Sequence, residues 1–257
     1  MPSWWNGAAS QVWFVGAFAS IIMLRNRFCI KYLIFNIFTV LSLLSIGWSH
    51  AAIFYMFVAK ELRKKSVAEY LLYMWQIEDI IRAYGCSLTR IRTEYIDQFQ
   101  YTDEQKEEEE DWFGDLVRMM NQEGCREGGH LQINKVLMQG LTELHKELLQ
   151  SSKFPFYSAE YYRVLPFIVE LRGKTKRTAD KMARTNDERL KSVAVQLGKS
   201  EIETCFDLLY GVMMLRLQKK EITPETTRAL NEITTFIGML SDYYIKDKTE
   251  GLNFGEE

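Results

Sequence analysis

The 257-residue sequence predicts an all-α fold, a single-domain bundle of six to seven helices preceded by a hydrophobic N-terminal extension. Beyond the extension, apolar residues recur at intervals of three and four, as in Val67, Leu71, Met74, Ile77 and Ile81. This is the spacing of a helix with one buried face. Strand-like alternation of any length is absent from this part of the sequence. With 47% apolar residues, 26% charged residues and four Cys, the composition excludes collagen-like, disordered and disulfide-rich classes.

The N-terminal extension, residues 1–55, has an unusual charge pattern. Neither it nor the four residues after it contain Asp or Glu, and its three bases lie between positions 25 and 31. Residues 32–59 form an uncharged run longer than the roughly 20 apolar residues that cross a bilayer, so one interpretation is an inner-membrane anchor. The other is a mis-called start, with native folding from Met56, because translated upstream DNA would also lack acids. We favour this second interpretation, under which the protein is cytoplasmic.

Helix start and stop signals place the elements of the first half of the chain. A first helix starts near Met56 and can end at Gly85, and Ser87 can start a second helix. Thr102, followed by Gln105, resembles a capping box. It opens a strongly acidic third helix whose early carboxylates suit the positive end of the helix dipole.

The same signals continue beyond the acidic helix. A fourth helix covers about residues 130–149, and Pro155 is placed in the loop after it. Ser158 is expected to cap a fifth helix, which Pro166 should kink or shorten because proline lacks a backbone N–H. The helix that Ser200 starts is apolar over a wide face, as expected of the central helix of a bundle.

A last helix opens at Thr223, with Pro224 as its first residue, and ends near Lys246. The helical domain is therefore predicted to span residues 56–246. Residues 247–257 form a polar C-terminal tail.

Three segments resemble a known family. They are AEYLLYMWQIEDIIRA near the start, CFDLLYGVMMLRLQKKEITPET in the centre, and the closing arrangement of the last helix. They are similar to an uncharacterised all-helical family of Bacteroidetes bacteria, a domain of unknown function. The resemblance covers about Met56 to Lys246 and leaves the first 55 residues out. It implies a bacterial, cytoplasmic protein, and it implies no activity, cofactor or catalytic residue.

The sequence offers little support for a metal site or a catalytic nucleophile. Glu127 and His130 have the Glu-x-x-His spacing of di-iron helical bundles, but those bundles need two such pairs and this chain has one. The cysteines are widely spaced and form no Cys-x-x-Cys motif. We therefore expect no metal, no cofactor and no catalytic residue.

Polar residues beside the apolar stripe of the first helix form a candidate ligand pocket. Glu78 and Arg82 are four apart in the favourable order, so a surface ion pair would explain them at modest energy. In the alternative, Glu78 lies at the edge of a pocket between helices and pairs with Arg216. That buried charge pair would be costly unless it were well bonded. The candidate pocket residues are Gln76, Glu78, Asp79, Arg82 and Arg216.

Residues 172–191 form a basic stretch with eight bases and three acids. Such a stretch could neutralise nucleic-acid phosphates, but no aromatic residue for base stacking accompanies it, so nucleic-acid binding is disfavoured. The acidic stretch 103–115, with eight acids and one base, can instead pair with it within the fold or across a dimer. The candidate patch residues are Arg172, Lys174, Lys176, Arg177, Lys181 and Arg184.

These observations favour a non-catalytic interaction or regulatory module over an enzyme, and they do not define a biochemical activity. One alternative is an enzyme or small-ligand-binding bundle with a pocket near Glu78 and Arg82. Another is a nucleic-acid-binding protein that uses residues 172–191. The expected partner is a protein or a second copy of the chain, and a membrane would be a partner only if residues 1–55 are translated.

Overall fold

The computed structural model describes residues 55–99, 101–184 and 198–254, and within these ranges it contains helices and no strand. The prediction of an all-α fold is confirmed. The described elements are α3 (Tyr55–Lys65), α4 (Val67–Ala83), α5 (Leu88–Glu94), the 3-10 helix η1 (Ile96–Gln98), α6 (Asp103–Gln122), α7 (Gln132–Gln150), α8 (Pro155–Arg184), α10 (Glu201–Leu217) and α11 (Pro224–Glu250).

The two interpretations of the N-terminal extension fall on residues 1–54, which lie outside the described residues. Among the helices that are described, none combines the length and the apolar character needed to cross a membrane.

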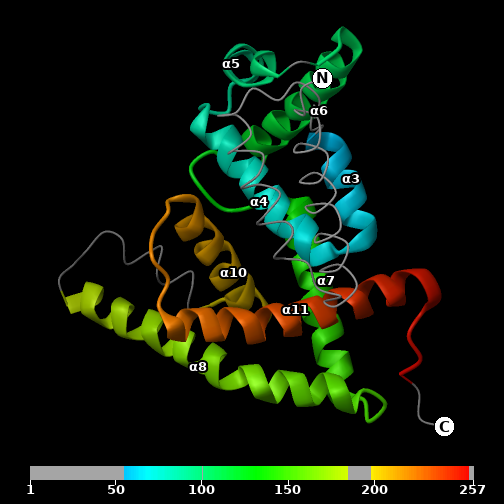
Figure 1. Cartoon of the computed structure of the whole chain (residues 1–257), viewed down its shortest axis with the longest axis vertical. Helices are drawn as coiled ribbons and strands as arrows, with labels where there is room; N and C mark the ends of the chain where they lie inside the picture. The colour runs from blue at the N-terminus through cyan, green and yellow to red at the C-terminus, as the bar shows by residue number, and fades with distance from the viewer. Residues whose placement is uncertain (1–54, 100, 185–197, 255–257) are drawn as a thin grey trace, which may run out of the picture. The chain divides into compact units, whose positions relative to one another are not determined.

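α4 is the central helix of the described bundle. It contacts α3, α6, α7, α10 and α11, and eleven of its 17 residues are buried (Figure 1). The sequence predicted the central place for α10, the helix that Ser200 starts, because its apolar face is wide. That prediction was wrong. Only six residues of α10 are buried, because one of its sides stays partly open to solvent.

Ser66 divides the first predicted helix into α3 and α4. Its backbone is extended, with a φ of −157°, and its side-chain oxygen accepts a hydrogen bond from the N–H of Glu69 at 3.3 Å. The Ser66 hydroxyl also lies 3.2 Å from that of Ser241 on α11, which in turn accepts from the N–H of Ala68. A single continuous helix from Met56 was therefore wrong, because the serine hydroxyl caps a new helix instead.

Several other start and stop signals are confirmed, but the last helix continues to Glu250, beyond its predicted end near Lys246. Gly85 has a φ of 69° just after the end of α4, in the left-handed region that favours glycine. Capping boxes open α6 and α10, and Thr223 accepts from the N–H of the third residue of α11. The capping residues are Ser87, Thr102, Gln105, Ser200, Glu203 and Thr223.

α8 differs from its prediction at both prolines. Pro155 is the first residue of the helix and not part of a loop, a position where its missing N–H costs nothing. Ser158 lies inside the first turn and donates to the carbonyl of Phe154 at 3.5 Å, so it is not the cap. Pro166 does not shorten the helix either. Pro166 has no N–H for the carbonyl of Tyr162, four residues earlier. Both residues are exposed, so water can bind this carbonyl instead.

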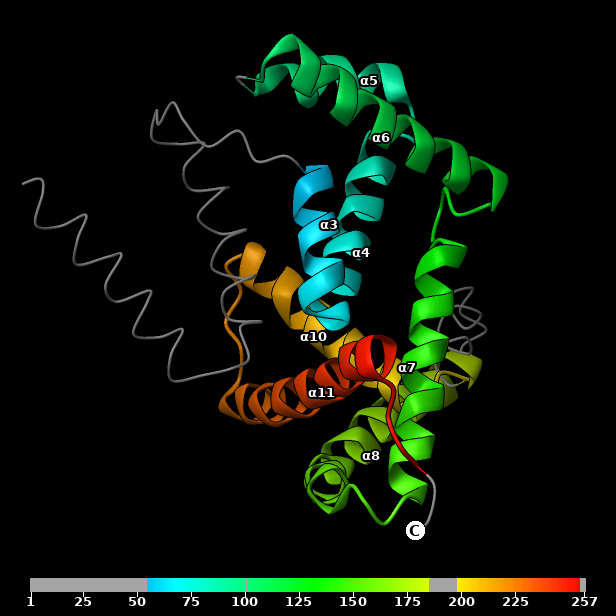
Figure 2. The ribbon, with the colours of Figure 1, turned by 90° about the vertical axis from the view of Figure 1, so that its right-hand side faces the viewer.

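The lower part of the bundle is formed by α7, α8, α10 and α11. α8 and α11 lie side by side in both views, and α10 and α7 contact both of them (Figures 1 and 2). α5 and α6 pack together at the other end, beyond α3 and α4 (Figure 2). A loop of residues 123–131 joins α6 to α7, and it is this loop that meets the polar residues of α4.

Candidate functional site

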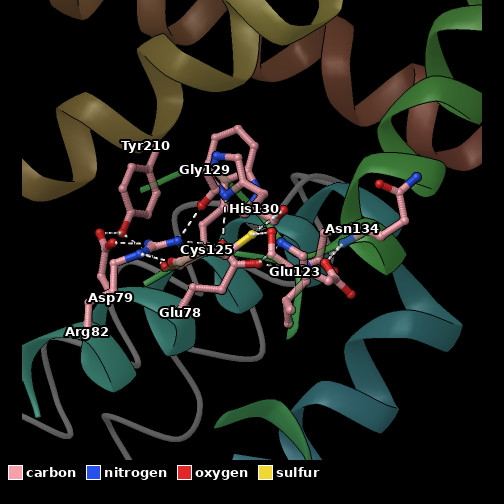
Figure 3. A network of polar contacts seen from close by, with 12 residues as sticks. Glu78, Asp79, Arg82, Glu123, Cys125, Gly129, His130, Asn134 and Tyr210 are labelled. Atoms are coloured by element: carbon pink, nitrogen blue, oxygen red, sulfur yellow. Dashed lines mark hydrogen bonds and ion pairs between the residues drawn. The ribbon is translucent and has the colours of Figure 1, made fainter. Parts of the chain in front are cut away.

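The polar centre of the molecule is Glu78 on α4, whose side chain is 0% exposed. Its Oε1 accepts hydrogen bonds from the backbone N–H of Leu131 at 2.9 Å and from Nδ2 of Asn134 at 2.8 Å (Figure 3). Its Oε2 lies 2.7 Å from Nδ1 of His130 and 3.8 Å from Nη2 of Arg82. A buried carboxylate is costly unless it is well bonded, and these four partners compensate its charge.

Glu78 also takes part in the start of α7. The residue before this helix is Leu131, whose apolar side chain makes no capping hydrogen bond. Two carboxylates from outside the helix replace the cap, since Glu78 accepts the N–H of Leu131 and Oε2 of Glu123 accepts that of Gln132 at 2.6 Å. Negative charge at this end suits the helix dipole, so Glu78 fixes α7 to α4.

Arg82 fastens the loop of residues 123–131 to α4. Its guanidinium donates to the carbonyl of Cys125 at 3.1 Å and to the carbonyl of Gly129, and it pairs with Asp79 at 2.6 Å. Gly129 has a φ of 82°, which a residue with a side chain would adopt at a cost in strain. The loop is thus held in one conformation by a charged group that itself contacts Glu78.

Tyr210 connects this network to α10. Its hydroxyl donates to a carboxylate oxygen of Asp79 and lies 3.3 Å from the carbonyl oxygen of Trp75 (Figure 3). Burial and the hydrogen bond to Asp79 raise the pKa of Tyr210, so the phenol keeps its proton and remains a donor. Three helices and one loop therefore share a single polar network.

His130 is held in one orientation by two neighbours. Its ring stacks on Trp75 with centroids 4.1 Å apart and planes at 15°. Glu78 accepts two other N–H groups and faces a guanidinium, so its partners assign the imidazole proton to Nδ1. Nε2 has no hydrogen-bond partner in the described part of the chain. The side chain is 32% exposed, so this nitrogen can meet a ligand.

A cavity of about 230 Å³ lies beside His130, between α4, α7 and the start of α10. Asn134 borders it, is 1% exposed, and has an Oδ1 without a hydrogen-bond partner among the described residues. The full lining is Trp75, His130, Asn134, Lys135, Met138, Gln139, Thr142, Lys199, Ser200 and Glu203. Apolar walls with a few converging polar groups are typical of small-molecule sites.

The α10 side of the cavity is internally bonded. Ser200 and Glu203 exchange two hydrogen bonds as a capping box, at 3.1 Å and 2.7 Å. The ammonium of Lys199 is 2.8 Å from both carboxylate oxygens of Asp207. Lys135 on α7 is exposed at the rim. The side chains on the α10 side are therefore engaged with one another, whereas Nε2 of His130 has no partner among the described residues.

Comparison with known proteins assigns the domain to a family. Residues 56–251 match the family described as Domain of unknown function, DUF4924. The chain belongs to this family. The match starts where the resemblance in the sequence starts and extends into the predicted C-terminal tail. Searches of curated proteins and of solved structures gave no match.

The structure brings together three of the five candidate pocket residues of this DUF4924 chain. Glu78, Asp79 and Arg82 share the network described above. Gln76 points toward α10 instead, where its amide lies 3.3 Å from the sulfur of Met213. Arg216 is half-buried near the end of α10, and among the described residues Glu78 pairs with Arg82 and His130 and not with Arg216.

Sequence reasoning missed His130 and Asn134, the two partners of Glu78 that border the cavity. His130 was considered only with Glu127, which is exposed. The available signal was the buried acid itself, because Glu78 on a helix with an apolar face requires donors from elsewhere. No group of three His, Cys, Asp or Glu side chains in the described ranges is arranged to hold a metal ion.

The basic stretch is only partly described. Lys181 and Arg184 lie in α8, but their side chains, like all of residues 185–191, are outside the described set. Lys174 pairs with Glu170 and Glu225, at 2.6 and 3.9 Å. The other described candidates are Arg172, which lies 4.0 Å from Glu201 and donates to the carbonyl of Lys199, and the exposed Lys176 and Arg177. The described partners of these bases lie outside the acidic stretch 103–115.

Proposed function

We propose that this DUF4924 domain is a regulatory module that binds a small molecule in the cavity between α4, α7 and α10. One observation carries the proposal, namely that His130 is fixed from two sides and presents an unpartnered nitrogen. Glu78 binds its Nδ1 and Trp75 sets the plane of its ring. Preorganisation of this kind lowers the entropy cost of binding.

The size and chemistry of the cavity support a small polar ligand. Its volume of about 230 Å³ is below the roughly 300–1,000 Å³ typical of sites for drug-sized molecules, so the enclosed part of a ligand would be small. Purely apolar cavities of similar size stay dry, whereas this one is bordered by His130 and Asn134. The burial of Glu78 supports the same conclusion, because its energetic cost is compensated by groups that also shape the cavity.

A role in protein association has less support from the surface. The large exposed apolar side chains of α8 are Phe156, Tyr162 and Val169. Tyr162 and Val169 are seven residues apart and share a face of the helix, but Phe156 lies about 120° away at 100° per residue. Scattered apolar side chains are normal on soluble proteins, so these residues favour no particular partner.

The proposal is tested by filling the cavity. Thr142 borders it and donates to the carbonyl four residues earlier at 2.9 Å, and Thr142→Phe would occupy the space. Thr235→Phe is the matched control, because Thr235 makes the same kind of bond at 3.1 Å on an exposed face of α11. The probe is a set of small polar fragments, including amides, amines, carboxylates and alcohols, screened by saturation-transfer NMR against the full chain.

We expect a subset of fragments to bind the wild-type chain and the Thr235→Phe variant and to lose binding in Thr142→Phe. Circular dichroism would establish that both variants keep their helix content. Two results would overturn the proposal: no fragment binds the wild-type chain at millimolar concentration, or every fragment that binds still binds Thr142→Phe.

A further inference from the structure

The charge of α3 differs from that of the chain around it. Its eleven residues contain four bases and one acid, whereas the whole chain has a formal charge of −2. The bases lie in the second half of the helix and are Lys60, Arg63, Lys64 and Lys65. In the described part of the chain, their ion pairs are with Glu61 of the same helix, at 3.2 and 3.5 Å. The hydrogen bond between α3 and the acidic helix α6 is at the other end, where Glu109 accepts the N–H of Met56.

An exposed aromatic side chain lies among these bases. Phe57 is 51% exposed, and the ammonium of Lys60 is 5.7 Å from the centroid of its ring. At 100° per residue, Lys60 and Lys64 lie within about 60° of Phe57 around the helix, and Lys65 within about 80°. We call Phe57, Lys60, Lys64 and Lys65 the basic face of α3. The ion pairs with Glu61 join exposed side chains, so they contribute little and can be exchanged for another anion.

The fold includes a residue before Met56. The carbonyl of Tyr55 accepts a hydrogen bond at 3.2 Å from the hydroxyl of Tyr73, a buried residue, and the Tyr55 ring belongs to an aromatic cluster. The cluster consists of Tyr55, Tyr73, Tyr95, Phe99 and Phe113. A chain that began at Met56 would lack this ring and this acceptor.

The uncharged run of the sequence leads into α3. Its last residues, from Tyr55 to Ala59, belong to this helix, and Ala59 is buried. The remaining residues, 32–54, still exceed the roughly 20 apolar residues that cross a bilayer. The basic face of α3 therefore follows, in the sequence, a segment long enough to enter a membrane.

From the charge, the exposed ring and this position in the chain, we infer that the basic face of α3 rests on a membrane surface rich in anionic lipids. Lys60, Lys64 and Lys65 bind lipid phosphates, and the Phe57 ring enters the boundary between headgroups and acyl chains. Bases next to a membrane segment are attracted to such a surface, and aromatic side chains are typical of helices that lie in it. The inference does not depend on the cavity beside His130.

A second copy of the chain is the alternative occupant, because residues 103–115 contain eight acids and one base. Ion pairs with those acids would account for the lysines of the basic face. They would not account for an aromatic ring exposed among the lysines, so the lipid surface is the better match.

The test places a photo-cross-linker, p-benzoyl-phenylalanine, at position 57 of the full chain. The chain is reconstituted in vesicles of phosphatidylcholine, with or without phosphatidylglycerol, and mass spectrometry identifies the adducts formed on illumination. Phe156 on α8 is also an exposed phenylalanine, and a chain with the cross-linker at position 156 is the control. We expect lipid adducts at position 57, at least about fivefold more of them with phosphatidylglycerol, because a single base near an anionic surface contributes about this factor.

Two sets of lysine substitutions show whether the charge of α3 causes this preference. Lys60→Gln, Lys64→Gln and Lys65→Gln, combined in one chain, should bring the ratio of adducts with and without phosphatidylglycerol close to one. The matched control combines Lys146→Gln, Lys153→Gln and Lys220→Gln, which change exposed lysines outside α3 and should leave the ratio unchanged. Circular dichroism would establish that both chains keep their helix content.

Three results would overturn the inference. The first is an equal yield of lipid adducts at positions 57 and 156. The second is a yield at position 57 that does not change with phosphatidylglycerol or with the α3 lysines. The third is cross-linking of position 57 to protein in place of lipid, and a cross-link to residues 103–115 of another chain would identify the acidic helix as the occupant.

Discussion

Glu78 shows how one residue can organise several elements. It is fully buried on the central helix, and its carboxylate accepts from the loop and from α7 while it faces Arg82. Every one of these partners is a donor or a cation. The residue therefore tolerates no replacement that brings a donor of its own, even one of the same size.

We predict that Glu78→Gln destabilises the fold by about 3 kcal/mol, since removal of one member of a buried charge pair costs roughly 3–5 kcal/mol. The glutamine NH₂ would face Nδ1–H of His130 or the donors of α7. Urea unfolding followed by circular dichroism gives the value. Glu143→Gln is the control, because Glu143 is an exposed acceptor for Gln139 at 2.8 Å and should change stability by less than about 0.5 kcal/mol. Equal effects of the two substitutions would contradict the central role of Glu78.

At the residue scale, the sequence identifies the charged residues of the polar network better than it identifies the residues that contact them. Glu78 and Arg82 stand four apart on a helix with an apolar face, so they could be selected from spacing alone. His130 and Asn134 reach Glu78 from 52 and 56 residues away in the chain. That contact depends on the path of a glycine-containing loop, which local periodicity does not specify.

The elements follow from local chemistry wherever a side chain meets its own backbone. Thr102 with Gln105 and Ser200 with Glu203 were recognisable because a capping box needs only four consecutive residues. Ser66 was missed because the apolar spacing continues through it. Its hydroxyl caps α4 and also contacts Ser241 from a distant helix.

α8 provides a prediction for a single element. Pro166 lies in the helix interior at an exposed position and removes one backbone hydrogen bond. Pro166→Ala should stabilise the fold by roughly 1–3 kcal/mol, because alanine restores the N–H and is the better helix former by about 3 kcal/mol before unfolded-state entropy is counted. Thermal unfolding should show a higher Tm. Val169→Ala, an exposed change on the same helix, should shift stability by no more than about 0.5 kcal/mol. A lower Tm for Pro166→Ala would show that α8 needs the rigid proline.

At the scale of the whole molecule, the all-α class was predictable and the packing order was not. Helical spacing identifies which face of each helix is buried, but it does not say which helix the others surround. α4 takes the centre because residues on nearly all of its sides are buried, including Glu78, whose charge is neutralised by neighbours. A helix with a wide apolar face, such as α10, does not need the centre, because apolar side chains can remain half-exposed.

Two buried titratable groups in different parts of the bundle link the stability of the whole fold to pH. Glu109 on α6 accepts the N–H of Met56 at 3.1 Å, and its Oε2 has no partner among the described residues. Burial raises the pKa of Glu109 from 4.5 to about 7. His145 on α7 lies 2.7 Å from the hydroxyl of Tyr157, and burial lowers its pKa from 6.5 to about 4. Each group is held uncharged by its surroundings.

The two pKa shifts predict pH dependences of opposite sign. The raised pKa of Glu109 gives a contribution to folding stability that is fully present below pH 4.5 and is lost as the pH rises to about 7. The lowered pKa of His145 gives a contribution that is fully present above pH 6.5 and is lost as the pH falls to about 4. In urea unfolding between pH 4 and 8, the stability of the wild type relative to Glu109→Gln should therefore fall by up to about 3 kcal/mol as the pH rises. The stability of the wild type relative to His145→Gln, a variant that keeps an acceptor for Tyr157, should rise by a similar amount as the pH rises. Two differences that are flat with pH, or that slope in the same direction, would mean that these groups are charged inside the fold and that its core admits water at both places.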